Sequence, residues 1–151
     1  AKSSRCEGRA MDELQVADCM HRGVVSCAPD TSLAEVAATM SGRDISAIVV
    51  MEGSTAVGLI SQTDLVNAAF VQPYMRFWRG LAARHLMSTP VIAVTPDTPL
   101  ADAVGLMRTR RIHRLVVVAP GEDDRPIGIL SLTDVVRRLG QAASEAAEHA
   151  P

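Results

Sequence analysis

The amino-acid sequence predicts an α/β (α+β) fold of two pseudo-twofold related β-α-β-β-α repeats that pack sheet to sheet. Three observations carry this prediction. The phrase "GLISQTDLV" at residues 58–66 returns as "GILSLTDVV" at residues 128–136. Residues 18–40 align with residues 85–107 at a constant shift of 67 positions. Each copy also shows the same order of strand and helix patterns, so the repeat describes a whole structural unit and not a single motif.

Each copy begins with a short strand pattern, a Pro-Asp-Thr turn and a helix pattern. The strand patterns are "GVVS" at residues 23–26 and "PVIAV" at residues 90–94. After the turn, apolar residues recur at intervals of three and four, which is the period of one helix face. We expect this face to bury Leu33, Val36, Met40, Leu100, Val104 and Met107. We expect Thr31 and Thr98 to cap the two helices, because a hydroxyl oxygen accepts bonds from the first backbone N–H groups.

Two further strand patterns and a second helix complete each copy. The strand patterns lie at residues 47–51 and 56–61 in the first copy, and at residues 114–119 and 126–131 in the second. Each final strand runs directly into a helix pattern. The predicted organisation is an N-terminal arm or cloning remnant at 1–15, a first repeat at 16–70, a connecting helix at 71–81, a second repeat at 82–140 and a helical tail at 141–151.

Composition narrows the classes of function. The chain has 151 residues, of which 48% are hydrophobic and 3% aromatic, and its formal net charge is -2. Such a chain buries a core but offers neither a basic field nor aromatic platforms for nucleic acid. No apolar run is long enough to span a bilayer, so we expect no membrane partner. Cys6, Cys19 and Cys27 have neither zinc-site nor CxxC spacing, and we expect them to be thiols in a reducing cytoplasm.

Motifs of enzymatic sites are missing from the sequence. The 151 residues contain no GxxxxGK[ST] loop, no GxGxxG turn, no HExxH helix and no GxSxG elbow. Asp64 and Asp134 occupy equivalent positions in the two copies, so they do not form a catalytic pair. We therefore expect a protein that is not an enzyme and that has no obligatory cofactor.

The repeated phrase keeps its Gly, Ser, Thr and Asp while its apolar residues vary. A Gly in the last strand permits close approach of another backbone or of a flat ring. The hydroxyl groups follow at a helix N-terminus, which favours phosphate, and a carboxylate offers two acceptors for a ribose diol. The candidate ribose-phosphate grips are Ser61, Thr63 and Asp64, and Ser131, Thr133 and Asp134. The alternative interpretation is that these residues only cap a helix, although a cap needs a single such residue.

The order of elements, with "GLISQTD" and "GILSLTD" at the last strand-to-helix junction, resembles the CBS domain, which occurs in tandem as a Bateman module. The resemblance covers residues 16–140 in both copies. It implies a regulatory module that binds an adenosyl ligand such as AMP, ADP, ATP or S-adenosylmethionine in clefts between the repeats. It also implies a homodimer formed through helix faces. "RIHRLVVV" and "ISAIVV" are similar to the last two repeats of the gamma subunit of AMP-activated protein kinase.

The resemblance also implies how the two sites are assembled. The first site would join Ser61, Thr63 and Asp64 to Ile92 and Arg114 of the other copy. The second site would join Ser131, Thr133 and Asp134 to Val25, Ser46 and His113. His113 and Arg114 match positions that reach a phosphate in the kinase gamma family, and the alternative for His113 is a buried structural histidine.

Three hypotheses of function follow from these patterns. The first is a sensor of adenosyl ligands that acts on an effector protein that the sequence does not identify. The second is an interaction scaffold whose clefts no longer bind ligand and whose helices serve to dimerise. The third is nucleic-acid binding through Arg108, Arg110, Arg111 and Arg114, against which the scarcity of aromatic residues argues.

Overall fold

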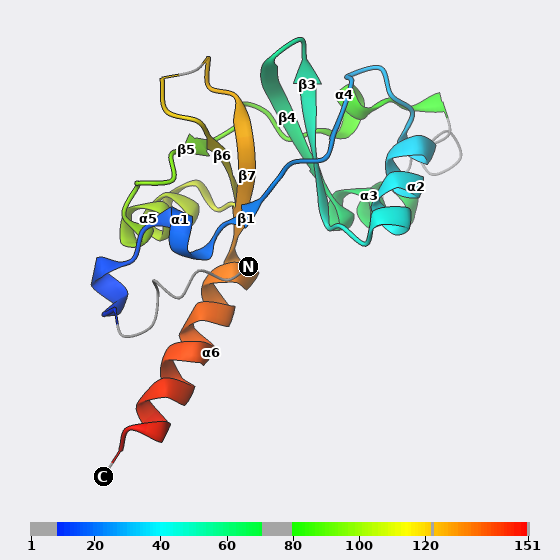
Figure 1. The fold of residues 1–151 in the computed structure, drawn as a ribbon. Coiled ribbons are helices and arrows are strands. Elements are labelled where there is room, and N and C mark those ends of the chain that lie inside the picture. The colour runs from blue at the N-terminus through cyan, green and yellow to red at the C-terminus, as the bar shows by residue number, and fades with distance from the viewer. Residues whose placement is uncertain (1–8, 71–79, 122, 151) are drawn as a thin grey trace. The chain divides into compact units, whose positions relative to one another are not determined.

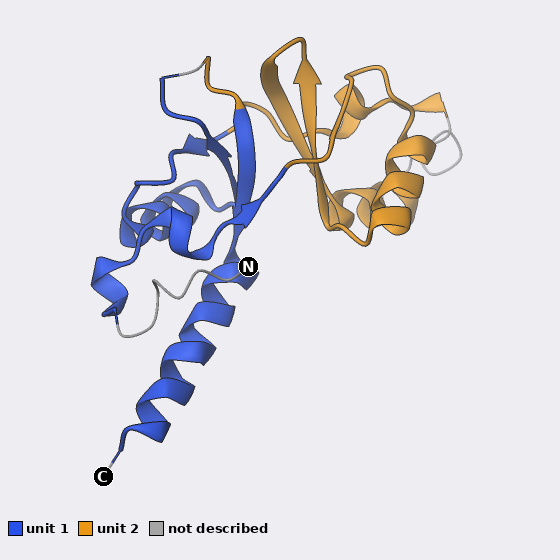
Figure 2. Ribbon diagram, viewed as in Figure 1, with its two compact units in different colours: residues 1–23, 92–122, 126–151 blue, residues 24–91, 123–125 orange. Residues whose placement is uncertain are grey.

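The structure is a computed structural model that describes residues 9–70, 80–121 and 123–150. The described chain folds into helices and strands of mixed order, which confirms the predicted α/β class (Figure 1). Two compact units are present (Figure 2). Unit 1 comprises residues 1–23, 92–122 and 126–151, and unit 2 comprises residues 24–91 and 123–125. Both units therefore combine parts of the two sequence repeats.

Unit 2 is a three-stranded sheet with helices. Its elements are β2 (Ser26–Cys27), α2 (Leu33–Arg43), β3 (Ala47–Glu52), β4 (Thr55–Ser61), α3 (Gln62–Phe70) and α4 (Ala83–Leu86). The strand order is β2-β3-β4, with β2 parallel to β3 and β3 antiparallel to β4. Helices α2 and α3 lie side by side in Figure 1. The core of the unit is formed by Leu33, Val36, Met40, Ile48, Val50, Ile60 and Ala83.

Unit 1 repeats this arrangement with one more strand. A short 3-10 helix, η2 (Met11–Glu13), comes first in its described part. The remaining elements are α1 (Val16–Cys19), β1 (His21–Arg22), β5 (Ala93–Val94), α5 (Leu100–Arg110), β6 (Arg114–Val118), β7 (Pro126–Ser131) and α6 (Leu132–Glu148). The strand order is β1-β7-β6-β5, and β1 pairs antiparallel with β7. Helix α6 runs through the predicted tail, so the last repeat helix and the tail are one helix.

The segment before each repeat's first strand packs on the other repeat's elements. In unit 1 the Val16 N–H donates to the Thr98 carbonyl oxygen at 2.9 Å. In unit 2 the Ala83 N–H donates to the Thr31 carbonyl oxygen at 2.8 Å. These two bonds are equivalent under the shift of 67 positions, and so are the bonds from Ala17 to Pro96 and from Arg84 to Pro29. The Pro-Asp-Thr turn of one repeat therefore accepts hydrogen bonds from a segment of the other repeat, here called the exchanged segment, which is residues 16–22 in unit 1 and residues 83–89 in unit 2.

The prediction that Thr31 and Thr98 cap the helices is wrong. The Thr31 Oγ1 accepts a bond from the Ala28 N–H at 3.1 Å, and the Thr98 Oγ1 accepts one from the Thr95 N–H at 3.1 Å. Both hydroxyl groups thus close the turn before the helix. The N-cap positions fall one residue later, at Ser32 and Pro99. The Ser32 Oγ caps α2 by accepting from the Glu35 N–H at 3.2 Å.

The predicted core is correct at five of its six residues. Leu33, Val36, Met40, Leu100 and Met107 are buried. Val104 is only partly buried, because Ala103 is the fully buried residue in the middle of that face of α5. The predicted connecting helix at 71–81 lies, for residues 71–79, outside the described residues. None of the described helices is long and apolar enough to cross a membrane.

Candidate functional site

The Gly of each repeated phrase makes the predicted close approach, and its partner is the exchanged segment. A Cβ on Gly58 would come within 2.7 Å of the Met87 Cβ. A Cβ on Gly128 would overlap the His21 carbonyl oxygen and the end of the Met20 side chain. Met20 and Met87 are equivalent under the shift of 67 positions. Chain packing thus accounts for the repeated Gly.

Ser61 and Asp64 form a reciprocal capping box at the start of α3. The Ser61 N–H donates to the Asp64 Oδ2 at 2.8 Å, and the Asp64 N–H donates to the Ser61 Oγ at 3.2 Å. Two backbone donors at the helix terminus are thereby satisfied. The Asp64 Oδ1 accepts no bond from the residues that the structure describes, so one carboxylate oxygen stays open.

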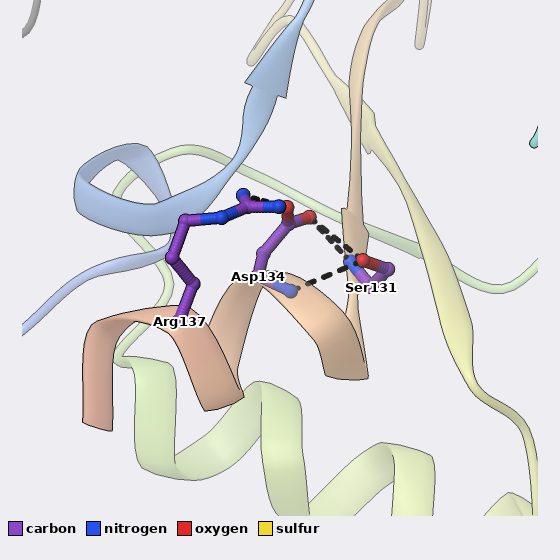
Figure 3. A network of polar contacts seen from close by, with 3 residues as sticks. All are labelled: Ser131, Asp134 and Arg137. Atoms are coloured by element: carbon purple, nitrogen blue, oxygen red, sulfur yellow. Dashed lines mark hydrogen bonds and ion pairs between the residues drawn. The ribbon is translucent and has the colours of Figure 1, made fainter. Parts of the chain in front are cut away.

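Ser131 and Asp134 form the same box at the start of α6 (Figure 3). The Ser131 N–H donates to the Asp134 Oδ2 at 2.9 Å, and the Asp134 N–H donates to the Ser131 Oγ at 3.2 Å. Here the second oxygen is occupied, since the Arg137 Nη1 lies 3.2 Å from the Asp134 Oδ1. In Figure 3 the Asp134 carboxylate lies between Ser131 and the Arg137 guanidinium.

The helix-capping interpretation of Ser and Asp is therefore correct as far as it goes. It does not account for the Thr in each phrase. Thr63 and Thr133 are exposed, and their hydroxyl groups make no hydrogen bond within the described parts of the chain. Each hydroxyl group belongs to the first turn of its helix, one residue before a carboxylate that the box holds in place. The capping boxes therefore explain the Ser and the Asp of each phrase but not its exposed Thr.

Two of the remaining predicted site residues, Ser46 and His113, bond to the first residue of the helix that follows a grip's Ser, while Val25 and Ile92 bond to the neighbouring strand. In unit 2 the Ser46 carbonyl oxygen accepts from the Gln62 N–H at 2.9 Å, and the Val25 carbonyl oxygen accepts from the Val49 N–H at 3.0 Å. The first bond holds the start of β3 next to the box, whereas the second joins the segment before β2 to β3 and not to β4, the strand that ends at Ser61. Ser46 is exposed, and Val25 is half-buried.

Unit 1 holds its corresponding residues in the same way. The His113 carbonyl oxygen accepts from the Leu132 N–H at 3.0 Å, and the Ile92 carbonyl oxygen accepts from the Val116 N–H at 3.1 Å. Arg114 is the ladder partner of Ser131 between β6 and β7. The structure thus brings His113 and Arg114 to the second grip, on the same unit. His113 was predicted at this second site, whereas Arg114 was predicted to join the first grip. Both assignments to a binding site stay predictions.

His113 does not have the burial of a structural histidine, because it is exposed. The nearby arginines Arg108, Arg110 and Arg111 are exposed at the end of α5, while Arg114 is half-buried. This difference separates Arg114, which is fixed in a strand, from the three arginines around the helix terminus.

Two arginines of α6 were not singled out from the sequence. Arg137 contacts Asp134, and Arg138 is buried with only 4% of its surface exposed. At the equivalent positions of α3 the first copy has Asn67 and Ala68. Comparing the two copies of the sequence would have singled out these arginines, since at both positions a charged residue of the second copy stands where the first copy has a neutral one.

The cysteines and possible metal ligands add no further site. Cys19 and Cys27 are half-buried and form no disulfide bond. Burial raises the pKa of the Cys27 thiol, a hydrogen bond with Thr31 lowers it, and the nearby Glu35 charge raises it. Cys6 lies outside the described residues. Within residues 9–70, 80–121 and 123–150, no group of His, Cys, Asp and Glu side chains has the arrangement of a metal site.

Comparison with known proteins identifies the repeats. A family model for the CBS domain matches residues 16–70 and 83–141. An uncharacterised protein of Methanopyrus kandleri is 30% identical over 128 residues, which cover 84% of this chain and 63% of the relative. The 5'-AMP-activated protein kinase subunit gamma-3 of Homo sapiens is 31% identical over 102 residues, which cover 64% of this chain and 20% of the relative. The chain thus spans less than two thirds of the length of these relatives.

A solved structure shares the fold. It is the crystal structure of a CBS domain pair in complex with 5'-methylthioadenosine and S-adenosyl-L-methionine. The two structures align with a TM-score of 0.74 at 20% sequence identity, over 85% of this chain and 98% of the other. The likeness extends over both repeats, so the tandem arrangement is common to the two proteins.

Proposed function

The chain belongs to the CBS domain family, and from this premise we propose that it is a regulatory module that binds an adenosyl ligand. The ligand class is AMP, ADP, ATP or S-adenosylmethionine. The two grips are Ser61, Thr63 and Asp64, and Ser131, Thr133 and Asp134. The module senses its ligand and carries out no reaction, and it acts on an effector protein. A reducing cytoplasm is the proposed compartment, on the basis of the cysteines alone.

The observation that carries the proposal is the exposed Thr beside a fixed carboxylate, present in both copies. The capping box needs only the Ser and the Asp. A carboxylate has about four lone-pair sites on its two oxygens, so the box leaves acceptors for ribose hydroxyl groups. Because the box holds the carboxylate in one position, a ligand does not lose free energy in ordering it.

Two printed ligand names support the adenosyl class. The kinase subunit that matches this chain is named for activation by AMP, and the solved CBS pair binds 5'-methylthioadenosine and S-adenosyl-L-methionine. These three molecules share adenine and ribose and differ in the group at the 5' position. A grip that recognises the ribose diol therefore suits the part of the ligand that is constant.

A ligand regulates such a module by a population shift. It favours one arrangement of the protein only by the difference in its affinity for the two arrangements. The same ligand raises the stability of the folded state by RT ln(1 + [L]/Kd). Thermal shift with AMP, ATP, adenosine and S-adenosylmethionine is therefore the first screen, and calorimetry gives the affinities.

Assembly into a homodimer is the second part of the proposal. The residues that face solvent on α3 and α6 include large apolar side chains, of which Val66 and Val136 occupy equivalent positions of the two copies. They are Val66 at 55% exposure, Phe70 at 73%, Val136 at 64% and Leu139 at 49%. Exposed apolar helix faces of this kind are typical of protein interfaces. The rival scaffold function needs only this surface, whereas the sensor also needs the grips.

The deciding experiment separates ligand binding from capping. The double variant Thr63→Ala, Thr133→Ala removes two exposed hydroxyl groups that make no structural bond. We expect it to keep the melting temperature of the ligand-free protein and to lose roughly two- to tenfold in affinity at each grip. Thr109→Ala, which removes an exposed hydroxyl group from α5, is the matched control. If the wild type binds none of the four ligands at millimolar concentration, the scaffold function stands instead. If the double variant binds as the wild type does, the ligand does not contact the Thr hydroxyl groups, and the proposed grips are refuted.

A further inference from the structure

We propose that Arg137 makes the two grips unequal, because it occupies the carboxylate oxygen of Asp134 that the capping box leaves open. The inference rests on the proposed function, since it concerns the same two carboxylates. It assigns a role to a residue outside the repeated phrase. Arg137 becomes a determinant of affinity at the second grip, and the first grip lacks this residue.

The two boxes can be compared directly, because each makes the same two hydrogen bonds between a backbone N–H group and a side-chain oxygen. The Oδ2 accepts from the Ser N–H at 2.8 Å in the first box and at 2.9 Å in the second. The return bond from the Asp N–H to the Ser Oγ is 3.2 Å in both. The boxes differ at the side chains. The Asp134 Oδ2 also accepts from the Ser131 Oγ at 3.0 Å, and the Asp134 Oδ1 accepts from the Arg137 Nη1 at 3.2 Å.

The difference follows from one position of the helix. Arg137 lies three residues after Asp134, where side chains share one helix face and meet. The first copy has Asn67 at that position. Asn67 is exposed and makes no hydrogen bond to Asp64 among the described residues. A neutral, shorter side chain thus leaves the Asp64 Oδ1 open, and a cation covers the corresponding oxygen of Asp134.

A ribose that binds Asp134 through both oxygens has to compete with the Arg137 guanidinium for the Oδ1. The Arg137 side chain keeps 59% of its surface exposed, and the Asp134 side chain only 11%. An ion pair whose cation is exposed to solvent is weak and is screened by salt. The competition therefore lowers the affinity for a neutral nucleoside by a modest factor, about two- to fivefold, and salt reverses it.

Adenosine is the sharpest probe, because it carries the ribose diol and no charge. A neutral ligand has no ion pair of its own for salt to weaken. We therefore expect its affinity at the second grip to rise as salt weakens the pair between Arg137 and Asp134. Its affinity at the first grip should not depend on salt. A purely structural role of Arg137 would not make adenosine bind more tightly with added salt at the second grip alone.

The experiment measures adenosine binding by calorimetry at about 0.01 M and about 1 M salt, where the screening length falls from about 30 Å to about 3 Å. Asp64→Ala isolates the second grip, and Arg137→Asn is added to it. We expect Arg137→Asn to tighten adenosine binding about two- to fivefold at low salt and to abolish the salt effect. The reciprocal variant is Asn67→Arg in the Asp134→Ala protein. It should weaken adenosine binding at the first grip and make that binding depend on salt.

Arg110→Asn in the Asp64→Ala protein is the control for net charge, since Arg110 is exposed on α5 and makes no contact with Asp134. It should leave adenosine binding unchanged. If Arg137→Asn weakens adenosine binding or leaves it as it was, the role of Arg137 is refuted while the adenosyl-ligand function stands. If the wild type binds neither adenosine nor any of the other three ligands, both proposals fall.

Discussion

The side chain of Met87 lies against the backbone of Gly58, in the space that the Cβ of any larger residue would occupy. The equivalent Gly128 is covered by Met20 and by the His21 carbonyl oxygen. In both units the covering residues belong to the exchanged segment. This contact therefore connects the repeated phrase to the segment that completes each unit.

Substituting these glycines should destabilise the protein to different degrees. Gly58→Ala places a methyl group against a side chain, and we expect a loss of about 1–2 kcal/mol in the free energy of unfolding. Gly128→Ala places it against a backbone carbonyl oxygen that β1 holds on β7, so the loss should reach about 3 kcal/mol. Chemical denaturation measures both. Gly105→Ala, whose Cβ would meet nothing within 4 Å on the helix α5, should instead stabilise by about 0.5–1 kcal/mol.

A double-mutant cycle checks the assigned contacts. Met87→Ala should remove only part of the cost of Gly58→Ala, because it removes the Met87 Sδ and Cγ but keeps the Cβ at 2.7 Å. Met20→Ala should not rescue Gly128→Ala, since the His21 carbonyl oxygen remains. Equal rescue in both units would contradict this account of the two glycines.

Helices α2 and α5, which each come before the second strand of a repeat, end at a residue that has a left-handed backbone conformation but is not glycine. Asp44 has a φ of 51° and Arg111 a φ of 54°, and each is the C-cap of its helix. Glycine adopts this conformation without the steric cost of a Cβ. Asp44→Gly and Arg111→Gly should therefore each raise the free energy of unfolding by about 0.5–1 kcal/mol. Arg110→Gly, one residue earlier and still helical, should lower it by about 1 kcal/mol.

The capping boxes make a measurable contribution to stability that does not depend on ligand. Ser61→Ala and Ser131→Ala each leave an Asp N–H without its acceptor at a helix N-terminus. We expect a loss of about 1 kcal/mol for each substitution in the ligand-free protein, measured by thermal denaturation. Ser41→Ala, at an exposed position inside α2, is the control and should change the stability by less than about 0.5 kcal/mol. Unchanged stability in both box variants would show that the boxes do not form in solution.

The Cys27 thiol should make stability depend on alkaline pH. Burial holds the pKa of Cys27 above its ordinary value of 9.0 in the folded protein, so the folded state binds this proton more tightly than the unfolded state. The stabilisation is complete below the unfolded pKa and is lost as pH rises through the folded pKa. In a protein with Cys6→Ser and Cys19→Ser, the melting temperature should fall above pH 9.0 more steeply than after a further Cys27→Ser substitution.

A second variant tests the cause of the shift. The Glu35 charge raises the pKa of Cys27, so Glu35→Gln should lower it and speed alkylation of the thiol at a given alkaline pH. Thr31→Val removes a hydrogen bond that lowers the pKa and should slow alkylation. The same change in rate for both variants would argue against these causes.

Features that depend on neighbours along the chain could be predicted from the amino-acid sequence. The alternation of strand and helix, the apolar face of α2 and the boxes of Ser61 with Asp64 and Ser131 with Asp134 all follow from residues within a few positions of one another. Such features repeat because the local phrase repeats. The candidate grips could be proposed from the sequence for the same reason, since Ser, Thr and Asp lie within one helical turn.

Contacts between segments far apart in the sequence could be seen only in the folded protein. The bond between the Val16 N–H and the Thr98 carbonyl oxygen joins residues that are more than half the chain apart, and no periodicity predicts it. The fault in the capping prediction has the same origin, because the turn that Thr31 closes also receives the Ala83 N–H. A backbone N–H group bonds to the acceptor that the packed chain brings within reach. Which acceptor that is depends on how the two hydrophobic cores pack, and not on the residues next to the donor in the sequence.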